Sequence, residues 1–394
     1  MIAAKQPFTA LLVDPSLFTA PYDAALDQGL RSAGVDTRWA VRPVRSGDRA
    51  DLPTRASLPL FYRHVDRLHR VPPTARKLLK GSSHVVGLAR TLKAALWFKA
   101  DLLHFQWTVV PVLDALAILV ARIRMRVVLT VHDTTPHNGE RMPLLQRFAF
   151  DVPIRLADRV IVHTRDGKAR LVARGIAANK IDVIAHGPLL LPPALDHLAR
   201  SRVQHASYTF TLFGELKHYK GLDVLVNAVA ALAPCLRART RVVVAGQPKM
   251  DLLTILARIH AMGLQEHFEL RLQRQTEAQM AALFAETDCF VFPYRQVDAS
   301  GAYFLTRSYS RWTIASRVGI FPDVIREGTD GALITPESAE ALADAMKAAV
   351  LRNAQVVSDI PSAMSWLEIG RLTRLTYISA LRGSGRARRG AWNE

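Results

Sequence analysis

The feature that most constrains this chain is the alternation of short apolar runs with helix-length amphipathic segments from one end to the other. Such alternation predicts parallel α/β structure, in which buried strands are joined by helices that cover the sheet. The apolar runs of the first half carry polar residues at their carboxyl ends: TALLVD, ADLLHFQW, RVVLTVHD, DRVIVHT and KIDVIAHG. The second half repeats the pattern in TFTLFGEL, RVVVAGQP, FELRLQ, CFVFPYR, WTIAS and GALITP, with helices predicted over 221–233, 251–262, 276–286 and 338–350.

A length of 394 residues favours two domains. Three prolines in GPLLLPPALDH break regular structure, and a polar stretch precedes the next strand. In chain order we predict an α/β domain over 1–190, a linker over 191–207, a second α/β domain over 208–352, a closing helical segment over 353–381 and a disordered basic tail over 382–394. In such a pair, ligands bind at the strand carboxyl ends that face the interdomain cleft.

The two cysteines, Cys235 and Cys289, show no metal-ligand spacing, and they favour a reduced, cytosolic protein over a disulfide scaffold. No run approaches the roughly 18 uncharged apolar residues of a membrane-spanning helix. The opening MIAAKQPFTALLVD reads as a buried strand rather than a secretory signal. We therefore expect a cytoplasmic protein that is soluble or peripheral to a membrane.

The net charge of +18 predicts attraction to an anionic partner. Between Arg38 and Lys99, fourteen lysines and arginines stand against three acids, which is more than half of the excess. Residues 60–100 interleave these cations with Leu, Phe, Tyr and Trp, a pattern that suits docking on an anionic leaflet. A solvated basic face is the alternative. Nucleic acid is not expected, because the clusters lie in no recognised nucleic-acid-binding motif.

The segment FGELKHYKG (213–221) joins a predicted strand to a predicted helix. Its Gly214 allows a tight turn, and Lys217 and Lys220 precede the helix. Backbone N–H groups at a helix start and ammonium charges both favour an anion, so this loop is a candidate diphosphate site. A solvated loop that happens to carry lysines is the alternative.

A second strand-end loop, VFPYRQVDASGAYF (291–304), carries Arg295 and Asp298 and then Ser300 and Gly301. A Ser-Gly pair at a strand-to-helix turn lets the backbone approach a ligand closely, although ordinary turns contain the same pair.

Histidines recur at the strand ends of the first half: His104, His132, His137, His163 and His186. Each one alone fits a structural hydrogen-bonding role, whereas several at one edge favour a catalytic or binding role near neutral pH. His132 with Asp133 is the pair of greatest interest. Metal binding is not expected, because no His pair has i, i+4 spacing and no carboxylate triplet accompanies them.

Taken together, these segments resemble the GT4-type glycosyltransferases over roughly residues 100–380. The resemblance implies a GT-B fold of two facing Rossmann-like domains, with the acceptor on the first and the nucleotide sugar on the second. A C-terminal helix, SWLEIGRLTRLTY in this chain, would cross back to the first domain. The resemblance also implies that no metal or other cofactor is needed.

The resemblance assigns site residues by position. Lys217 and Lys220 match the family's diphosphate-binding pair, and Gly214 matches the glycine that admits the phosphates. His132 matches the histidine that meets the donor sugar, and His186 with Gly187 matches the strand-end pair before the linker. With Ser300, Gly301, His104 and Arg295 they complete the predicted site.

The family's Glu-x7-Glu loop is missing, because Val297 and Leu305 occupy those two positions. The loop PYRQVDASG instead resembles that of the xanthan-pathway β-mannosyltransferase, an inverting type. Inversion would need a carboxylate base, for which Asp133 and Asp298 are the candidates. Retention would rely on stabilising the donor phosphate. Arg311 and Trp312 replace the small Gly-x-Pro that the family has before this strand, which predicts a narrowed or reshaped nucleoside pocket.

The expected function is transfer of a hexose from a GDP- or UDP-sugar to a lipid-linked or glycan acceptor in exopolysaccharide or glycolipid synthesis. The expected location is the inner face of the cell membrane, with segment 38–99 against anionic lipid. Two alternatives stay open: a GT-B protein that binds nucleotide or glycan without turnover, and a sugar-nucleotide epimerase.

Overall fold

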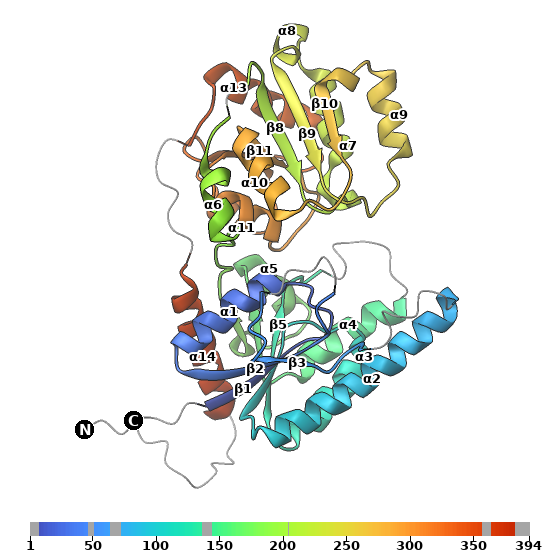
Figure 1. The fold of residues 1–394 in the computed structure, drawn as a ribbon, viewed down its shortest axis with the longest axis vertical. Coiled ribbons are helices and arrows are strands. Elements are labelled where there is room, and N and C mark those ends of the chain that lie inside the picture. The colour runs from blue at the N-terminus through green and yellow to red at the C-terminus, as the bar shows by residue number, and fades with distance from the viewer. Residues whose placement is uncertain are drawn as a thin grey trace, which may run out of the picture. The chain divides into compact units, whose positions relative to one another are not determined.

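A computed structural model describes residues 8–45, 51–63, 72–135, 144–203, 205–356 and 364–382. It separates into two compact units (Figure 1). Unit 1 runs to Gly187 and resumes at Met364, and unit 2 begins at Pro188 and ends before Met364. Each unit is a sheet of parallel strands with interleaved helices, which confirms the predicted α/β class with two Rossmann-like domains.

The sheet of unit 1 has the strand order β3-β2-β1-β4-β5-β6-β7. Its strands are β1 (Phe8–Asp14), β2 (Val35–Val41), β3 (Ser57–Pro59), β4 (Leu102–Phe105), β5 (Arg126–Val131), β6 (Arg159–Val162) and β7 (Ile181–Val183). Its helices are α1 (Ala20–Ser32), α2 (Pro73–Trp97), α3 (Pro111–Arg122), α4 (Leu144–Leu156), α5 (Arg165–Ala173) and α14 (Trp366–Arg382). Alternate residues of β1 point to opposite faces. Leu11 and Val13 join the core under α2, α3, α4 and α5, whereas Ala10 and Leu12 join the core under α1 and α14.

Helix α14 returns the chain to unit 1 and packs directly on α1. At Gly370 an added Cβ would lie 2.1 Å from the carbonyl oxygen of Gly29, and at Gly29 it would lie 2.1 Å from that of Trp366. Any larger residue at these two positions would push the helix backbones apart. Tyr377, fully buried, then places its hydroxyl against the sheet. The predicted closing helix therefore belongs to unit 1.

The sheet of unit 2 has the order β10-β9-β8-β11-β12-β13. Its strands are β8 (Tyr208–Phe213), β9 (Thr240–Ala245), β10 (Phe268–Arg271), β11 (Cys289–Phe292), β12 (Trp312–Ser316) and β13 (Gly331–Ile334). Its helices are α6 (Pro193–Arg200), α7 (Leu222–Ala231), α8 (Pro234–Arg237), α9 (Leu253–Ala261), α10 (Glu277–Glu286), α11 (Gly301–Arg307), α12 (Phe321–Val324) and α13 (Ala339–Arg352), with a 3₁₀ turn η4 (His218–Lys220) before α7. Helices α7, α9 and α13 cover one face, and α6, α10, α11 and α12 cover the other.

Three local predictions differ from the structure. The strands β2 and β3 were not anticipated. The predicted linker 191–207 contains α6, which packs on α10 within unit 2. Arg311 anchors this region, because its buried guanidinium donates to the carbonyl oxygens of Phe284, Tyr309, Ala199 and Ser201. Arg311 and Trp312 lie at the amino end of β12, opposite the carboxyl edge of the sheet, so the prediction that they narrow or reshape a nucleoside pocket at that edge is wrong.

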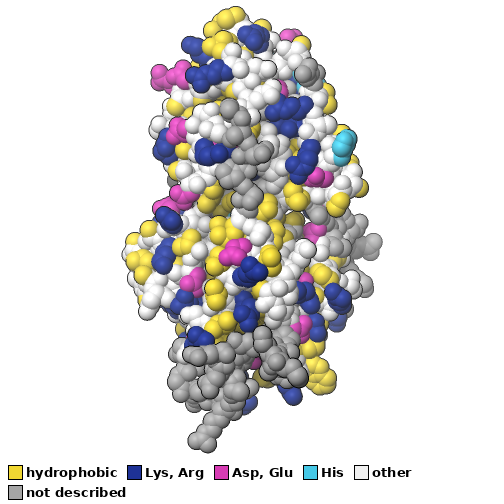
Figure 2. Space-filling view, turned by 90° about the vertical axis from the view of Figure 1, so that its left-hand side faces the viewer, with side chains coloured by type: hydrophobic (Ala, Val, Ile, Leu, Met, Phe, Trp, Pro, Cys, Tyr) yellow, Lys and Arg dark blue, Asp and Glu magenta, His cyan; other side chains and the backbone are white. Residues whose placement is uncertain are grey.

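The basic segment 38–99 is not one surface. Arg42 is buried and donates to the carbonyl oxygens of Ser16 and Pro43, whereas Arg76, Lys80, Arg90 and Lys93 are exposed along α2. On the face seen in Figure 2, lysine and arginine side chains are scattered rather than gathered in one patch. In the part of the chain that the structure describes, no helix is long and apolar enough to cross a bilayer.

Candidate functional site

The loop after β8 in unit 2 brings a lysine beneath a glycine. Gly214 has φ +102°, and a Cβ added there would lie 2.7 Å from Nζ of Lys220. Lys220 is 5% exposed, its Nζ donates to the carbonyl oxygen of Phe213 at 3.2 Å, and it lies 5.4 Å from the ring centre of Tyr294. Gly221, with φ +70°, allows a close approach of the chain to Pro293 before α7 starts. The ammonium group is therefore held at the carboxyl end of the sheet, next to a helix start.

Burial lowers the pKa of Lys220 to about 7, although Glu215 partly opposes this effect. A buried ammonium group without a bound anion loses hydration that the protein replaces only in part. A diphosphate at this loop would restore the missing electrostatic stabilisation and hold the lysine charged. The loop is thus suited to bind an anion.

Other predicted donor-binding residues lie on the same side of unit 2. Lys217 is partly exposed and its Nζ lies 3.4 Å from Oε2 of Glu215. Ser300 caps α11, because its Oγ accepts from the backbone N–H of Tyr303 at 3.3 Å. Gly301 is exposed, and a Cβ added there would meet nothing within 4 Å, so the surrounding protein leaves room for a side chain at this position.

Arg295 has a structural arrangement that its sequence position did not reveal. Its guanidinium binds both carboxylate oxygens of Asp223, at 3.1 and 2.7 Å, and its Nε donates to Glu337 at 2.8 Å. Nη1 also donates to the carbonyl oxygen of His218. The guanidinium joins the loop after β11 to η4, α7 and the segment before α13. In the structure it fixes the shape of the lysine loop.

Asp298 follows in the same loop and is 5% exposed, and its carbonyl oxygen accepts from the N–H of Ile320. Val297 and Leu305, which occupy the positions of the family's two glutamates, pack in the hydrophobic core of unit 2. The loop after β11 is therefore held by apolar packing where a typical member has carboxylates.

In unit 1, rings gather at the carboxyl ends of β5, β6 and β7. Because Val131 pairs with Val162 in the sheet, His132 and His163 follow at equivalent positions. His132 Nδ1 lies 3.1 Å from His163 Nε2, and the His132 ring stacks on Trp107 with 4.7 Å between ring centres and 11° between planes. Tyr22 contacts His132 edge-on at 5.0 Å. Burial is the main cause that lowers the pKa of His132 well below its usual value, and the neighbouring histidines lower it further. The ring is therefore neutral.

His186 and Gly187 lie at the same edge. His186 Nδ1 lies 2.6 Å from the carbonyl oxygen of Gly187, and burial lowers the pKa of His186 to about 3. A Cβ on Gly187 would lie 2.5 Å from the Trp366 ring, so this glycine makes room for the start of α14. Tyr22, His132, His163, His186 and Trp366 form one ring cluster.

His104 is placed differently. It is fully buried, with Nδ1 2.7 Å from the Tyr377 hydroxyl and Nε2 2.8 Å from Thr130 Oγ1. Burial lowers its pKa to about 3. It ties β4 and β5 to α14 and exposes no ring nitrogen to a ligand. Asp133, beside His132, is half-buried, and His137 lies outside the described residues.

Sequence reasoning missed several members of the unit 1 site. Asp14, at the end of β1, and Asp23, in the first turn of α1, are both fully buried, and burial raises the pKa of each. Thr19 connects both to Trp107, which stacks on His132: its backbone N–H donates to Asp14 at 3.4 Å, and its Oγ1 donates to Asp23 at 3.4 Å and accepts from Trp107 Nε1 at 3.0 Å. The strand-end position of Asp14 and the Trp of HFQW were the available signals. Tyr22 and Trp366 had none, because only the fold brings them to this edge.

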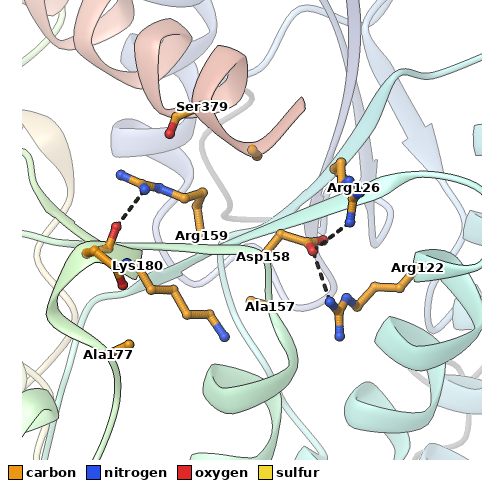
Figure 3. Close-up of a pocket in the computed structure, with 10 residues that line it drawn as sticks. Arg122, Arg126, Ala157, Asp158, Arg159, Ala177, Lys180 and Ser379 are labelled. Atoms are coloured by element: carbon orange, nitrogen blue, oxygen red, sulfur yellow. Dashed lines mark hydrogen bonds and ion pairs between the residues drawn. The ribbon is translucent and has the colours of Figure 1, made fainter. Parts of the chain in front are cut away.

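A separate hollow of about 370 Å³ lies at the opposite edge of the unit 1 sheet, around the first residues of β5 and β6 (Figure 3). In Figure 3, Arg122 and Arg126 both point at Asp158, at 3.1 and 3.0 Å. Arg159 also binds Asp182, which the figure does not draw. Lys180 Nζ donates to the carbonyl oxygen of Arg155. These cations already have partners, and the hollow lies at the strand amino ends, so the candidate sites remain the ring cluster of unit 1 and the lysine loop of unit 2.

Two family models match the chain, one in each unit. The model Glycosyltransferase Family 4 covers residues 24–187, and the model Glycosyl transferases group 1 covers residues 207–351. This chain is a GT4-type glycosyltransferase with the GT-B fold. The loop that holds Lys217 and Lys220 lies in the second match, and His132, His163 and His186 lie in the first. None of the curated protein sequences matches the chain.

Solved glycosyltransferase structures share the fold. Anabaena Alr3699/HepE in complex with UDP and glucose is 15% identical with a TM-score of 0.63, covering 95% of this chain and 97% of that one. Sucrose-phosphate synthase of Thermosynechococcus elongatus is 14% identical with a TM-score of 0.64, covering 95% of each chain. The catalytic domain of starch synthase IV of Arabidopsis thaliana, bound to ADP and acarbose, is 12% identical with a TM-score of 0.69, covering 96% of this chain and all of that domain. These similarities confirm the GT-B architecture.

Proposed function

We propose that this GT4-type enzyme transfers a hexose from a UDP- or GDP-sugar to a lipid-linked or glycan acceptor. Unit 2 would hold the nucleotide sugar and unit 1 the acceptor. The observation that carries the proposal is the buried Lys220 beneath Gly214, a cation held at a strand end without a neutralising ion pair of its own in the described residues. The UDP- and ADP-bound states of the similar structures support a nucleotide donor.

We propose that the diphosphate charge is stabilised by lysines rather than by a metal ion. Lys220 and the partly exposed Lys217 supply the positive charge, and the starts of η4 and α7 supply backbone N–H groups. Among the residues described, no three His, Cys, Asp or Glu side chains gather as metal ligands would. Negative charge develops on the leaving diphosphate as the sugar bond breaks, so the two lysines act where the transition state needs them.

The stereochemistry depends on which group removes the acceptor proton. For inversion, Asp133 or Asp298 would act as the base. For retention, the leaving phosphate would take the proton, and the lysines would provide the larger catalytic contribution. Val297 and Leu305 carry no oxygen that could meet the sugar or the ribose, so the hydroxyl contacts of the donor would come from other residues, His132 among them.

We propose that helix α2 docks unit 1 on an anionic leaflet, at the inner face of the cell membrane, during exopolysaccharide or glycolipid synthesis. Leu78, Val85 and Leu96 are exposed and lie along one line of the helix, with Trp97 beside it at 79% exposure. The exposed cations Arg90 and Lys93 lie on the same side of the helix as Trp97, and Arg76 and Lys80 are exposed near its amino end. Apolar side chains can enter the interface while each nearby cation contributes about 1 kcal/mol on anionic lipid.

The docking proposal is tested with vesicles that contain or lack phosphatidylglycerol. The wild type should sediment with the anionic vesicles, and Leu78→Ser with Trp97→Ser should reduce the bound fraction about tenfold. The control pair is Leu253→Ser with Leu351→Ser, two exposed leucines of unit 2. Equal loss in both pairs would contradict docking through α2.

The donor proposal is tested by thermal shift with UDP, GDP and their sugars, followed by transfer assays with the donor that stabilises the protein. Slow release of free sugar, or acceptor-dependent loss of the donor sugar, supports a transferase. Stabilisation without turnover would instead favour a binding protein. A new sugar nucleotide formed with no acceptor present would favour an epimerase.

A further inference from the structure

Three groups at the carboxyl ends of β5, β6 and β7 form a hydrogen-bond chain. In the sheet, Val131 pairs with Val162 and Val162 pairs with Val183, so the next residues on the three strands are His132, His163 and Ile184. Nδ1 of His163 lies 2.9 Å from the carbonyl oxygen of Ile184. Nε2 of His163 lies 3.1 Å from Nδ1 of His132. The sheet register thus sets the order of the chain.

The direction of the chain follows from its end. A carbonyl oxygen only accepts, so Nδ1 of His163 carries a hydrogen and donates it to Ile184. In a neutral imidazole the other nitrogen then has a lone pair, and Nε2 of His163 must accept. Nδ1 of His132 therefore donates, and the Nε2 of His132 is left with a lone pair.

This direction holds only while both rings are neutral. His132 is 9% exposed and His163 is 3% exposed, and the rings packed against them belong to Tyr22, Trp107 and His186, none of which is acidic. A buried imidazolium among such neighbours would be poorly solvated. Burial and the adjacent histidines accordingly lower the pKa of His132 well below its usual value.

The other ring nitrogen of His132, Nε2, is buried and forms no hydrogen bond with the described protein. The ring cannot turn freely to find one, because Trp107 stacks on its face and Tyr22 packs against it edge-on. Buried polar atoms are normally hydrogen-bonded, so an acceptor nitrogen without a partner in the protein indicates that a bound ligand donates a hydrogen bond to it.

We propose that His163 is a positioning residue that holds the hydrogen of His132 on Nδ1, so that Nε2 accepts from a hydroxyl group of the bound sugar or acceptor. This inference rests on the proposed function for the identity of the ligand, but not for the state of the histidine. The recognised group must carry a hydrogen. An O-methyl or deoxy analogue at that hydroxyl loses the contact, and a carboxylate there is repelled by the lone pair.

The tautomer is measured by NMR of the full-length ligand-free chain, labelled with ¹⁵N in its histidines, at pH 7.5. Spectra of His132→Ala identify the His132 signals. We expect wild-type His132 to be neutral with its hydrogen on Nδ1. In His163→Leu, which removes the acceptor, this preference should be lost. In His163→Gln it should be kept, because the amide can donate to Ile184 and accept from His132. His84→Gln alters a different buried network of unit 1, through Asp114 and Tyr62, and should leave the tautomer unchanged.

Hydrogen on Nε2 of wild-type His132, a charged ring at pH 7.5, or an unchanged tautomer in His163→Leu would each overturn the proposal. If His163→Leu does not fold, the wild-type and His163→Gln spectra still decide. With a donor and acceptor in hand, His163→Leu should lower transfer about tenfold and His163→Gln less than about threefold. In a His132→Ala background, His163→Leu should have no further effect. A failed transfer assay with the expected tautomer would count against the proposed function alone.

Discussion

The two units share one strand order over six strands, with a seventh strand at the edge of the unit 1 sheet, and they present different chemistry at their strand ends. In unit 1 the carboxyl edge is a cluster of neutral rings, and all five buried histidines of the described chain lie in that unit: His84, His104, His132, His163 and His186. In unit 2 the same edge carries the buried Lys220, with glycines that bring the backbone close to it. The same order of strands therefore carries buried rings at its carboxyl edge in one unit and a buried lysine in the other, depending on a few strand-end residues.

The largest effect should come from removing the cation of unit 2. Lys220→Met removes the charge but keeps an unbranched side chain of nearly the same length, and it should reduce transfer about 10²–10³-fold, as the loss of one preorganised charge-stabilising group does. Lys347→Ala on α13, an exposed lysine of the same unit, is the control. Steady-state transfer rates measure both. Full activity in Lys220→Met would contradict the assignment of Lys220 to the diphosphate site.

Lowering the pH tests whether the buried histidine His104 of unit 1 is uncharged. His104 has a pKa of about 3 in the folded protein against an ordinary value of 6.5, so its stabilising contribution is present above pH 6.5 and is lost as pH falls toward 3. The free energy of unfolding of the wild type relative to His104→Gln should therefore fall by about 2–3 kcal/mol between pH 7.5 and 4.5. Urea unfolding at both pH values measures it. The exposed His197→Gln of unit 2 is the control, and an equal fall there would remove the contrast between the units.

The ring cluster should affect chemistry more than nucleotide binding. His132→Ala is expected to lower kcat/KM for transfer about 10²-fold while the Kd for UDP or GDP changes less than about twofold, because the histidine lies on unit 1 and the lysines on unit 2. Isothermal titration and initial rates give the two quantities. A large loss of nucleotide affinity in His132→Ala would contradict the assignment of nucleotide binding to unit 2.

Substitutions at two glycines test how closely the nucleotide donor approaches the backbone of unit 2. Gly214→Ala would bring a Cβ within 2.7 Å of Nζ of Lys220 at a backbone with φ +102°, so nucleotide affinity should fall about tenfold. Gly301→Ala meets nothing in the protein and should keep full thermal stability. If Gly301→Ala nevertheless weakens donor binding, the ligand itself approaches that backbone, as the sequence predicted.

The smallest expected effect is the change in donor affinity with pH. Lys220 has a pKa of about 7, and a diphosphate favours its charged form, so affinity for a UDP- or GDP-sugar should fall up to about tenfold between pH 7 and 8.5. Titrations in buffers of different ionisation enthalpy should also show proton uptake on binding. Lys220→Met should bind weakly at every pH in this range.

Much of this architecture was readable from the sequence, because buried parallel strands give uninterrupted apolar runs that end in polar residues. The lysine loop and His132 were found by the same rule. Arg295 was not understood, since its partners Asp223 and Glu337 are 72 and 42 residues away in the chain. Asp23, Tyr22 and Trp366 were missed for the same reason. Short strands such as β3 escaped because three half-buried residues carry no periodic signal.

The glycine contact between α1 and α14 sets the order in which the molecule can be completed during synthesis. Unit 2 is one continuous stretch of chain, so it can fold as soon as it has left the ribosome. Unit 1 begins first and must wait, because the helix that packs Gly370 on Gly29 and Tyr377 on His104 is made only after the described part of unit 2. Until then the apolar face under α14 is uncovered. Unit 1 is thus completed after unit 2, and a truncation near residue 360 would leave unit 2 whole and the α14-binding face of unit 1 uncovered.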